Sequence, residues 1–495
     1  MRSLLLGYGL FASALIIGSC LLYFIIMLLS RRTVLATIQS AAYSRFRELG
    51  HSAYTPPVSV LVPAYNEELT VLESVRSLLS LDYPGYEVIV VNDGSKDGTL
   101  QVLIEAFGLQ PSSVSGYRRT LRSRTIRQAY RSPLHPRLVV IDKDNGGKAD
   151  ALNAGINVSR YPLIATVDAD SMLEKDALLR LVRTYMENPE EHIAVGGNVR
   201  IANGSTIEHG MVRKSRMPRR WLPAIQSVEY ARSFLGGRIG WSALNGLTII
   251  SGAFGLFRKD RLIEVGGYEP GCPGEDMNVV LKLHKRMLDL GLPYSIVFCP
   301  DAVCWTQAPD TLEVLASQRR RWMRGSLWNL AAFRSMLFIP KYKTIGFLSL
   351  PYTIIYETLG PYLRLTGFLA LVGYCLFDMT NWPILAMFIA VNALVGLVFT
   401  CGALLIDEMA FRRSPAGKDL AKTIVCSLLM AVGYDQLQAL WKLAGQWEYV
   451  RKSDAWGNMV RTSWQEGADS SAASPAATAS AKSGKQSQAA KAPAV

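Results

Sequence analysis

Paired cysteines are missing from this sequence. Its 495 residues include seven cysteines, and no two of them have C-x-x-C spacing. The seven are scattered along the chain, at Cys20, Cys272, Cys299, Cys304, Cys375, Cys401 and Cys426. Because a structural zinc site or a disulfide framework needs clustered or regularly spaced cysteines, the sequence supports neither.

Charged residues are missing from two long stretches. Residues 4–30 and 379–406 contain no Asp, Glu, Lys or Arg. A helix rises about 1.5 Å per residue, so either stretch is long enough to cross a hydrocarbon core of roughly 30 Å. The hydrophobic content of 49% is high for a soluble enzyme. We therefore expect spanning helices here, the first of them an anchor because no small-residue cleavage site is evident.

The region around the second stretch is less regular. Apolar residues continue over 344–441, with a weaker candidate span at 421–434. At 344–377, Glu357 and Arg364 interrupt the apolar run, and Pro351 and Pro361 are expected to break its helix. This part is consistent with an interfacial helix plus one span, or with two spans.

Basic residues indicate an orientation and exclude one class of partner. Arg31, Arg32 and two further arginines follow the first stretch, whereas Arg2 alone precedes it, which places the amino terminus outside and the following domain in the cytoplasm. The net charge of +13 is densest at 117–137, where seven arginines lack interleaved aromatics suited to base stacking. We expect no nucleic-acid partner, and interpret this segment, like 213–220, as a loop solvated beside anionic lipid headgroups.

Short, branched, apolar runs are plentiful in the first half of the chain. Those at 58–63, 87–91, 138–141 and 163–167 predict buried parallel strands. Mixed polar and apolar segments of helical period lie between them, at 68–80 and 146–157. Strand alternates with helix, so the sequence predicts an α/β sheet.

Polar side chains follow several of these strands. Asn66, Asp93 and the pair Asp168 and Asp170 all come directly after a predicted strand, and ligands of open α/β sheets bind at that edge. Carboxylates two residues apart suit Mg²⁺ or Mn²⁺, which also binds phosphate oxygens. A D-x-D pair is weak evidence by itself, but its place after a buried strand and downstream of Asp93 favours a metal site over a turn.

Two more groups suit the same chemistry. Lys148 follows two glycines at a predicted helix start, where a cation and free N–H groups can hold an anion. Glu275 and Asp276 follow Gly274 at the start of an amphipathic helix. There they either only favour the helix dipole or supply a general base that takes a proton from an attacking hydroxyl.

The run Q-R-R-R-W at 318–322 lies on a predicted helix. Gln318, Arg321 and Trp322 can share one face of it. The arginine fork suits a diphosphate, and an indole can cover the apolar face of a sugar ring. The other two arginines, Arg319 and Arg320, are expected to meet solvent or headgroups.

With these motifs in this order, residues 55–450 resemble the membrane-embedded, processive family 2 glycosyltransferases, which include hyaluronan, chitin, cellulose and poly-N-acetylglucosamine synthases. The matching positions are PAYNEE at 63–68, Asp93, Lys148, the D-x-D at 168–170, SGAFGLFRK at 251–259, GED at 274–276 and Q-x-x-R-W at 318–322. The resemblance implies an α/β, type A glycosyltransferase (Rossmann-like) cytoplasmic domain with flanking transmembrane α-helices.

The resemblance also implies residue roles. Asp276, with Glu275 beside it, is the expected catalytic base, and Asp168 and Asp170 are expected to bind Mg²⁺ or Mn²⁺. The expected donor-binding residues are Pro63, Tyr65, Glu67, Asp93, Lys148, Asp168, Gln318 and Arg321, with Asp93 on the uracil or ribose. The expected acceptor-binding residues are Ser251, Gly252 and Trp322. One base and one displacement predict inversion at the anomeric carbon.

The expected reaction is transfer from a UDP-sugar to a growing β-linked polysaccharide, with export through the chain's own transmembrane bundle. The expected partners are a nucleotide-sugar donor, a polysaccharide or lipid-linked acceptor, membrane lipids, and co-polymerase or export subunits. Two alternatives stay open: transfer of a single sugar to a lipid acceptor, and a non-catalytic membrane scaffold. GED in place of Thr-Glu-Asp keeps the base assignment but leaves the sugar unassigned. A single amino-terminal span, and no recognisable cyclic-dinucleotide module, argue against a complete cellulose synthase subunit.

The expected domains follow from these assignments. They are an anchor at 1–32, a catalytic domain at 55–335, interfacial and transmembrane helices at 344–441, a basic membrane-proximal segment at 442–466, and a tail at 467–495. The tail is almost wholly Ala, Ser, Lys, Gln and Pro, a composition that predicts disorder. The expected location is the bacterial inner (plasma) membrane, with the catalytic domain in the cytoplasm.

Overall fold

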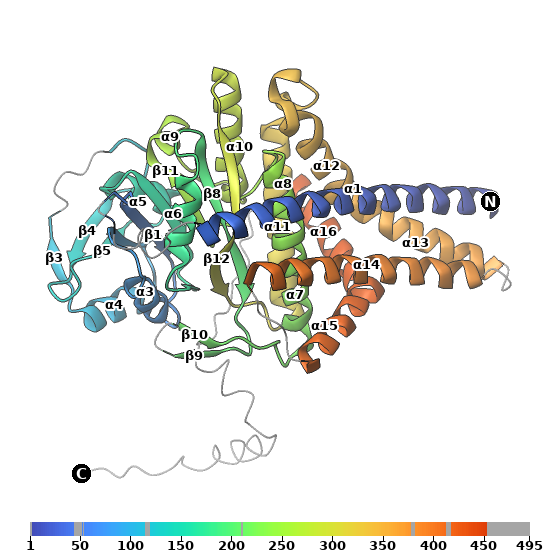
Figure 1. Cartoon of the computed structure of the whole chain (residues 1–495), viewed down its shortest axis with the longest axis horizontal. Helices are drawn as coiled ribbons and strands as arrows, with labels where there is room; N and C mark the ends of the chain where they lie inside the picture. Colours follow the sequence, from blue (N-terminus) through green and yellow to red (C-terminus); the bar gives the residue numbers. More distant parts are fainter. Residues whose placement is uncertain are drawn as a thin grey trace, which may run out of the picture.

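The computed structural model describes residues 2–43, 52, 54–113, 119–208, 211–377, 382–411 and 417–452. A sheet with covering helices forms one part of the molecule, and long apolar helices extend from it on one side (Figure 1). The predicted tail at 467–495, and the segment 442–466 beyond residue 452, lie outside the described residues.

The main sheet is mixed. Its four predicted strands are confirmed as neighbouring parallel strands, in the order β5-β2-β1-β6. Their bounds are β1 (Val58–Ala64), β2 (Tyr86–Asn92), β5 (Leu138–Lys143) and β6 (Leu163–Val167). Nearly all their side chains are buried, as expected of strands covered on both faces.

Six more strands extend this sheet, in the full order β3-β4-β5-β2-β1-β6-β11-β8-β12-β7. They are β3 (Gln110–Ser112), β4 (Ile126–Arg131), β7 (Ser171–Leu173), β8 (His192–Ile201), β11 (Phe254–Arg258) and β12 (Ser295–Thr306). Several pairs are antiparallel, including β11 with β6 and β4 with β5. A separate hairpin joins β9 (Thr206–Glu208) and β10 (Met211–Lys214).

The arginine-rich segment at 117–137 differs from its prediction as a solvated loop. It contains β4, which pairs with β5 on one side and with the short edge strand β3 on the other. Ala129 is buried, whereas Arg127 and Arg131, near the two ends of β4, are exposed. β4 also lies at the end of the sheet opposite the long apolar helices (Figure 1), which does not match the expected place beside lipid headgroups.

Helices cover the sheet and lead away from it. They are α3 (Val71–Leu79), α4 (Thr99–Phe107), α5 (Lys148–Val158), α6 (Ala177–Met186), α7 (Trp221–Ala231), α8 (Ile239–Ala243), α9 (Lys259–Glu264), α10 (Glu275–Leu290) and α11 (Leu312–Ala332). A π-helical segment, η1 (Arg232–Arg238), joins α7 to α8. Short 3₁₀ turns, η2 (Arg334–Met336) and η3 (Pro340–Tyr342), follow α11.

Close packing of α5 on the sheet depends on a glycine. A β-carbon at Gly155 would lie 3.1 Å from Leu61 Cδ2 and 3.4 Å from Val91 Cγ2. The helix therefore sits directly on β1 and β2, and its first residue, Lys148, is held over the carboxyl ends of the strands.

The apolar helices are α1 (Arg2–Tyr43), α13 (Gly360–Phe377), α14 (Trp382–Phe411), α15 (Gly417–Leu429) and α16 (Asp435–Val450). Before α13, the chain continues as helix through η4 (Ile345–Ser349), α12 (Leu350–Tyr352) and η5 (Thr353–Leu359), and η7 (Met430–Tyr434) joins α15 to α16. The break expected at Pro351 and Pro361 is therefore wrong, because wide π turns carry the helix past both prolines. The expected boundary at residue 441 falls inside α16.

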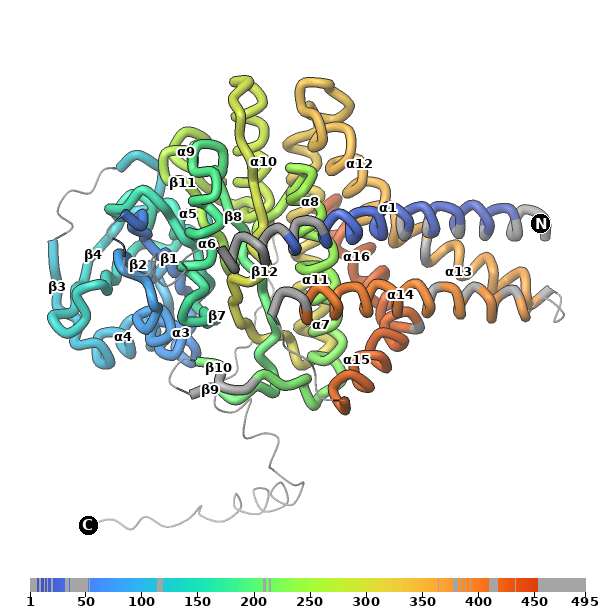
Figure 2. The backbone as a smooth tube through the Cα atoms, in the orientation of Figure 1, coloured from blue at the N-terminus to red at the C-terminus, as the bar shows by residue number. Residues whose placement is uncertain are grey.

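Two helical stretches are long and apolar enough to cross a membrane, Ile345–Leu376 and Leu385–Glu408. In α1 the described stretch of this character, Leu21–Arg31, is shorter. Figure 2 shows α1 and α14 side by side, and the two helices are in contact. α1 also meets η1, where the Tyr23 hydroxyl donates to Arg232 O at 2.6 Å and the Ser30 hydroxyl to Gly236 O at 3.1 Å.

Candidate functional site

The loops after β1, β2 and β5 are bound together around Asp93. Its carboxylate accepts hydrogen bonds from the N–H groups of Gly146 (3.0 Å) and Gly147 (2.7 Å), and from the Asn145 amide at 3.3 Å. Its own N–H donates to Ala64 O at 2.9 Å. Asp93 is buried, and it shapes the glycine turn that leads into Lys148.

Lys143, which the sequence pattern did not single out, lies beneath this turn. Its side chain is fully buried and its ammonium bonds Asp93, Asp150 Oδ1 at 2.7 Å and Asp144 O at 2.6 Å. Burial raises the pKa of Asp93, and the Lys143 charge acts in the opposite direction. The available signal was a lysine that ends an otherwise apolar strand.

The expected donor residues after β1 lie beside the same loop. Pro63 is in β1, opposite Val91 of β2. Tyr65 is exposed, whereas Glu67 is buried, with its N–H on Thr99 Oγ1 at 2.8 Å and its carboxylate accepting from the Thr70 hydroxyl at 2.7 Å. Glu67 therefore stabilises the start of α3. Of these two expected donor-binding residues, Tyr65 is the one whose side chain is accessible to a ligand.

Lys148 contacts one carboxylate of the D-x-D pair and one of the GED motif. Its ammonium lies 2.6 Å from Asp168 Oδ1 and 3.3 Å from Glu275 Oε1. A β-carbon at Gly252 would lie 2.6 Å from this ammonium, so a side chain at residue 252 would displace the Lys148 ammonium. Three segments that are far apart in sequence thus meet at one cation, as the sequence predicted from their positions at element ends.

The charges at this cluster shift one another's pKa. Burial lowers the pKa of Lys148, but the charges of Asp168 and Glu275 raise it more, so it lies above its usual value. Burial raises the pKa of Asp168 and of Glu275, while Lys148 lowers both. Lys148 therefore keeps its charge and helps to keep both carboxylates ionised.

Asp170 and Asp276 complete the two acidic pairs. Asp170 is partly exposed at the end of β6, and Ser171 Oγ lies 3.5 Å from its Oδ1. Asp276 is also partly exposed in the first turn of α10, where its Oδ1 accepts from the Met277 N–H at 2.8 Å. Over the described residues no three His, Cys, Asp or Glu side chains form a ready metal cluster, so an ion would need ligands from a bound substrate.

Two glycines hold the GED turn against α11. A β-carbon at Gly325 would lie 2.9 Å from Gly274 Cα, and one at Gly274 would lie 3.1 Å from Gly325 Cα. The Asn329 amide donates to Gly274 O at 2.9 Å and to Gly325 O at 3.0 Å, and it accepts from Asn278 at 2.9 Å. The predicted base and the Q-x-x-R-W helix are thereby fixed relative to each other.

The arginines of α11 divide into two kinds. Arg319 is buried and pairs with Glu229 at 2.8 Å, and Arg320 pairs with Glu448 at 3.0 Å. The expectation that Arg319 meets solvent or headgroups is wrong, because Glu229 of α7 and Tyr434 of η7 pack on this side of α11. Arg320 stays partly exposed while it pairs with Glu448 of α16. Within the described part of the chain, Arg321 forms no ion pair.

The other two motif residues of α11 are placed differently. Gln318 Oε1 is buried and has no hydrogen-bond partner among the described residues. Trp322 is 43% exposed, and the Arg319 guanidinium lies 4.4 Å from its ring centre. Ser251 precedes β11 and accepts the Phe254 N–H through its carbonyl at 3.1 Å.

A stacked column on α7 and η1 was missed by the sequence analysis. The Tyr230 and Phe234 rings stack at 5.7 Å, and Arg238 Cζ lies 3.9 Å from the Phe234 ring centre. Arg238 Nη1 is buried with no hydrogen-bond partner among the described residues. Burial lowers the Arg238 pKa to about 10, against the effect of the Asp276 charge. The spacing of four residues was the signal that would have found this column.

Comparison with known proteins agrees with the geometry. A family model described as glycosyltransferase like family 2 matches residues 56–325, and one described as chitin synthase matches residues 278–410. A poly-β-1,6-N-acetyl-D-glucosamine synthase of Staphylococcus epidermidis is 32% identical over 268 residues, 54% of each chain. One from Staphylococcus aureus strain COL is 31% identical over 270 residues, again 54% of each chain. This chain thus spans about half the length of the curated relatives that it matches.

A solved structure supports the fold. The mannosyltransferase PcManGT of Pyrobaculum calidifontis, in complex with GDP-Man and Mn²⁺, is 18% identical and superposes with a TM-score of 0.51, over 87% of this chain and 100% of that one. The predicted α/β class is confirmed, and so is the resemblance to processive family 2 enzymes. The chain belongs to glycosyltransferase family 2.

Proposed function

We propose that this chain transfers a sugar from a nucleotide-diphospho-sugar to a growing β-linked polysaccharide, with inversion, on a type A glycosyltransferase domain. The observation that carries the proposal is the cluster at Lys148, whose ammonium is shared by Asp168 and Glu275. It joins a candidate metal site to a candidate base at the sheet edge where nucleotides bind.

The donor diphosphate has two candidate protein cations. Lys148 is held at the end of α5 by its two carboxylates, and Arg321 extends from α11 without an ion pair in the described structure. The other α11 arginines are engaged with Glu229 or Glu448. Arg321 is therefore the guanidinium of this helix that can change partners at low cost, and a planar fork suits two diphosphate oxygens.

The residues at the end of β6 fit a divalent cation. Asp168 and Asp170 supply hard carboxylate oxygens, and Mg²⁺ typically takes one or two carboxylates plus substrate phosphates. When bound, Mg²⁺ or Mn²⁺ would neutralise the charge that develops on the leaving diphosphate. The Lys148 ammonium contacts Asp168, so it would place a second positive charge beside the diphosphate oxygens.

The transfer itself needs one base. Asp276 Oδ2 would take the proton of an acceptor hydroxyl while that oxygen forms its bond to the anomeric carbon and the bond to the diphosphate breaks. Glu275 is held by Lys148, which leaves Asp276 as the member of the pair that Lys148 does not contact. A single displacement of this kind inverts the anomeric configuration. The half-exposed Trp322 ring would bind the acceptor sugar, together with Gly252, which lies beside the Lys148 ammonium, and its sequence neighbour Ser251.

N-acetylglucosamine is the first sugar to test, because the curated relatives at 32% and 31% identity are named poly-β-1,6-N-acetyl-D-glucosamine synthases. The two apolar stretches, Ile345–Leu376 and Leu385–Glu408, would place the enzyme in the bacterial inner membrane with the sheet domain in the cytoplasm. Export of the product through this bundle, and co-polymerase or export subunits as partners, belong to the same proposal.

The deciding assay uses purified protein in lipid with Mg²⁺ or Mn²⁺ and labelled UDP-N-acetylglucosamine, UDP-glucose or UDP-glucuronate. We expect a metal-dependent polymer from one donor, lost by at least about 100-fold in Asp276→Asn. Asp82→Asn, which changes an exposed aspartate away from the cluster, is the matched control and should keep full activity. A short labelled lipid as the sole product would replace polymer synthesis by single transfer, and no turnover with any donor would contradict the proposal.

A further inference from the structure

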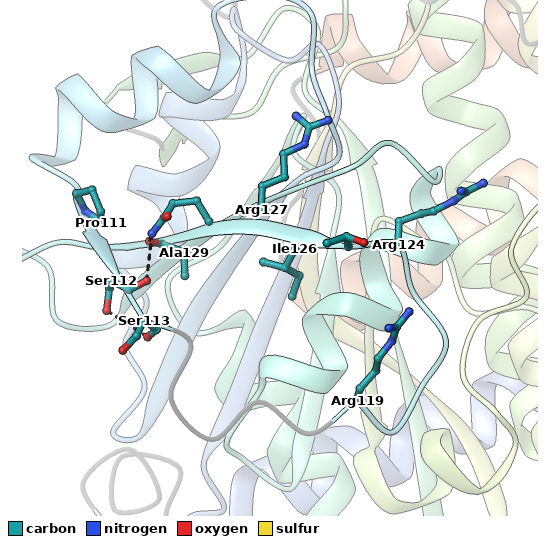
Figure 3. A pocket seen from close by; sticks show the side chains of 10 residues that line it. Pro111, Ser112, Ser113, Arg119, Arg124, Ile126, Arg127 and Ala129 are labelled. Carbon is teal, nitrogen blue, oxygen red and sulfur yellow. Dashed lines mark hydrogen bonds between the residues drawn. The ribbon is translucent and has the colours of Figure 1, made fainter.

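A pocket of about 620 Å³ lies at the end of the sheet, where the edge strand β3 pairs with β4. Arg119 and Arg124, from the loop before β4, and Arg127, from β4 itself, line it together with Ser112, Ile126 and Gln128 (Figure 3). Its volume is typical of a site for a small molecule. None of the residues assigned to the donor or acceptor lines it.

The pocket carries an excess of positive charge. Arg127 is balanced by Asp144 at 2.6 Å, and Asp142 lies farther away at 3.8 Å. Arg119 donates to the backbone oxygen of Ser123 at 2.9 Å, which leaves its charge uncompensated. Arg124 forms no ion pair in the described structure. Two guanidinium groups are thus available to an anion.

The walls of the pocket are also part of the support beneath Lys148. The Arg124 N–H donates to both Asp150 carboxylate oxygens at 3.0 Å, and Asp150 pairs with Lys143. The Asp144 N–H donates to Thr125 O at 3.0 Å. A β-carbon at Gly146 would lie 2.9 Å from Arg124 Cγ, so the arginine stem rests on the turn that Asp93 holds.

We propose that this pocket binds a small, soluble, multiply charged anion of the phosphate type and couples it to the donor site. The anion would bind Arg119 and Arg124 and compete with Asp144 for Arg127. Because Asp144 and Asp150 belong to the support of the Asp93 turn, occupancy changes donor affinity. A soluble ligand is favoured over a lipid headgroup because β4 lies at the end of the sheet opposite the long apolar helices (Figure 1).

The test uses pyrenetrisulfonate, a fluorescent trianion, with the full chain in neutral nanodiscs containing Mg²⁺ and saturating UDP, which occupies the proposed donor site. Fluorescence polarisation should show binding that inorganic phosphate displaces. The double variant Arg119→Gln, Arg124→Gln should weaken binding at least about tenfold, because it removes two charged hydrogen-bond donors from the pocket. The matched control Arg122→Gln, Arg131→Gln removes two exposed arginines of the same segment that do not line the pocket, and should bind like the wild type.

Coupling has its own readout, independent of whether the enzyme makes polymer. The anion should shift the dissociation constant of UDP about fivefold or more in the wild type and the control, and not in the Arg119, Arg124 variant. Equal weakening by both double variants would mean that probe binding depends only on the net positive charge of this segment, which would overturn the proposal. So would competition in which UDP abolishes probe binding, because the pocket would then be part of the donor site. Loss of probe binding in nanodiscs of anionic lipid would assign the pocket to a headgroup and overturn a soluble ligand.

Discussion

Position 143 shows how one side chain can support a whole site. Lys143 is buried between Asp150 and Asp93, an expected donor-binding residue, and is not itself assigned to substrate. Its charge lets two carboxylates stay buried, and these in turn fix the turn at 145–147 and the backbone of Arg124. Its effect on catalysis is therefore indirect, through the position of Lys148.

Replacing Lys143 with Met should be among the most destabilising single changes in the sheet domain. It leaves two buried carboxylates without their cation, and breaking a buried pair in this way costs about 3–5 kcal/mol. Thermal unfolding in detergent should show a large drop in midpoint. Lys96→Met, at an exposed lysine, is the control. A Lys143→Met protein as stable as the control would show that the carboxylates are solvated or protonated instead.

His284 predicts a pH dependence of stability. It is fully buried, with Nε2 2.8 Å from Leu247 O and Nδ1 2.7 Å from the Tyr294 hydroxyl, and burial lowers its pKa to about 4. Between pH 6.5 and about 4 the unfolded state therefore binds the proton that the folded state refuses. The free energy of unfolding should fall as pH decreases through this window, by up to about 1.4 kcal/mol per pH unit from this residue.

The check compares unfolding of the wild type and of His284→Gln at several values between pH 4.5 and 7.5. The variant should lose this part of the slope, while His135→Gln, whose ring lies against Phe107, should keep it. An unchanged slope in His284→Gln would assign the acid sensitivity to other groups.

Among single residues, the sequence predicted those whose position at the end of a strand or the start of a helix already indicates a role. Asp168, Glu275 and Lys148 each stand at the end of a strand or the start of a helix, and parallel strands bring such ends to one edge. Lys143 and Arg238 escaped prediction because their roles depend on burial and on partners from distant segments. Arg319 was predicted wrongly for the same reason, and the ion pair of Arg320 was not foreseen, since nothing near 320 in sequence indicates Glu229 or Glu448 as partners.

At the scale of elements, α16 decides where α11 lies. Gly445 permits the contact, because a β-carbon there would lie 2.8 Å from Arg320 O and 3.0 Å from Arg320 Cα. Glu448 bonds Arg320 at 3.0 Å and Arg324 at 3.6 Å, and the Gln446 amide donates to Thr358 O at 2.7 Å. Contacts with α16 thus fix the position of α11, the helix that bears Gln318, Arg321 and Trp322.

Gly445→Ala should separate these two helices and displace the motif. Misplacing catalytic groups by up to about 1 Å costs on the order of 10–100-fold in rate, and we expect a loss of kcat/KM in this range with a smaller change in stability. Donor turnover and thermal unfolding, measured together, separate the two effects. Gly417→Ala, where an added β-carbon meets nothing within 4 Å, should change neither turnover nor stability. Equal turnover in the two variants would contradict the idea that α16 positions α11.

The elements were predictable where apolar runs were uniform. The strands at 58, 87, 138 and 163 were found because branched apolar residues make up most of each run. β4 was missed because Arg127, Gln128 and Arg131 make half of its six residues polar, without an alternating pattern. The helix through Pro351 and Pro361 was missed because a neighbouring π turn, which sequence does not show, can absorb a proline.

For the whole molecule, the apolar stretches predict membrane integration. Exposed leucines such as Leu394, Leu405 and Leu376 cover the outside of α13 and α14, and about 20 consecutive apolar residues suffice to span a bilayer. After alkaline carbonate extraction the protein should remain in the membrane pellet and require detergent for release. Recovery in the supernatant would mean that these helices pack against another protein instead.

The number and arrangement of spans could not be derived from sequence alone. Length and hydropathy mark candidate spans such as residues 379–406. They do not reveal that Arg232 of η1 reaches α14 and α15, where its Nε lies 2.9 Å from Thr400 Oγ1 and its Nη2 3.2 Å from Ser427 Oγ. Such contacts join the sheet domain to the apolar helices, and they depend on tertiary packing.

The touching glycines at 274 and 325 have an evolutionary consequence. Any side chain at either position would force the GED turn away from α11, so we expect both to resist substitution even while the enzyme acquires a new substrate. Changes in sugar preference then have to arise around them, at positions such as Ser251 and Trp322 that have room to vary. The same scaffold can diversify its products while the spacing between the proposed base and the proposed diphosphate-binding helix stays fixed.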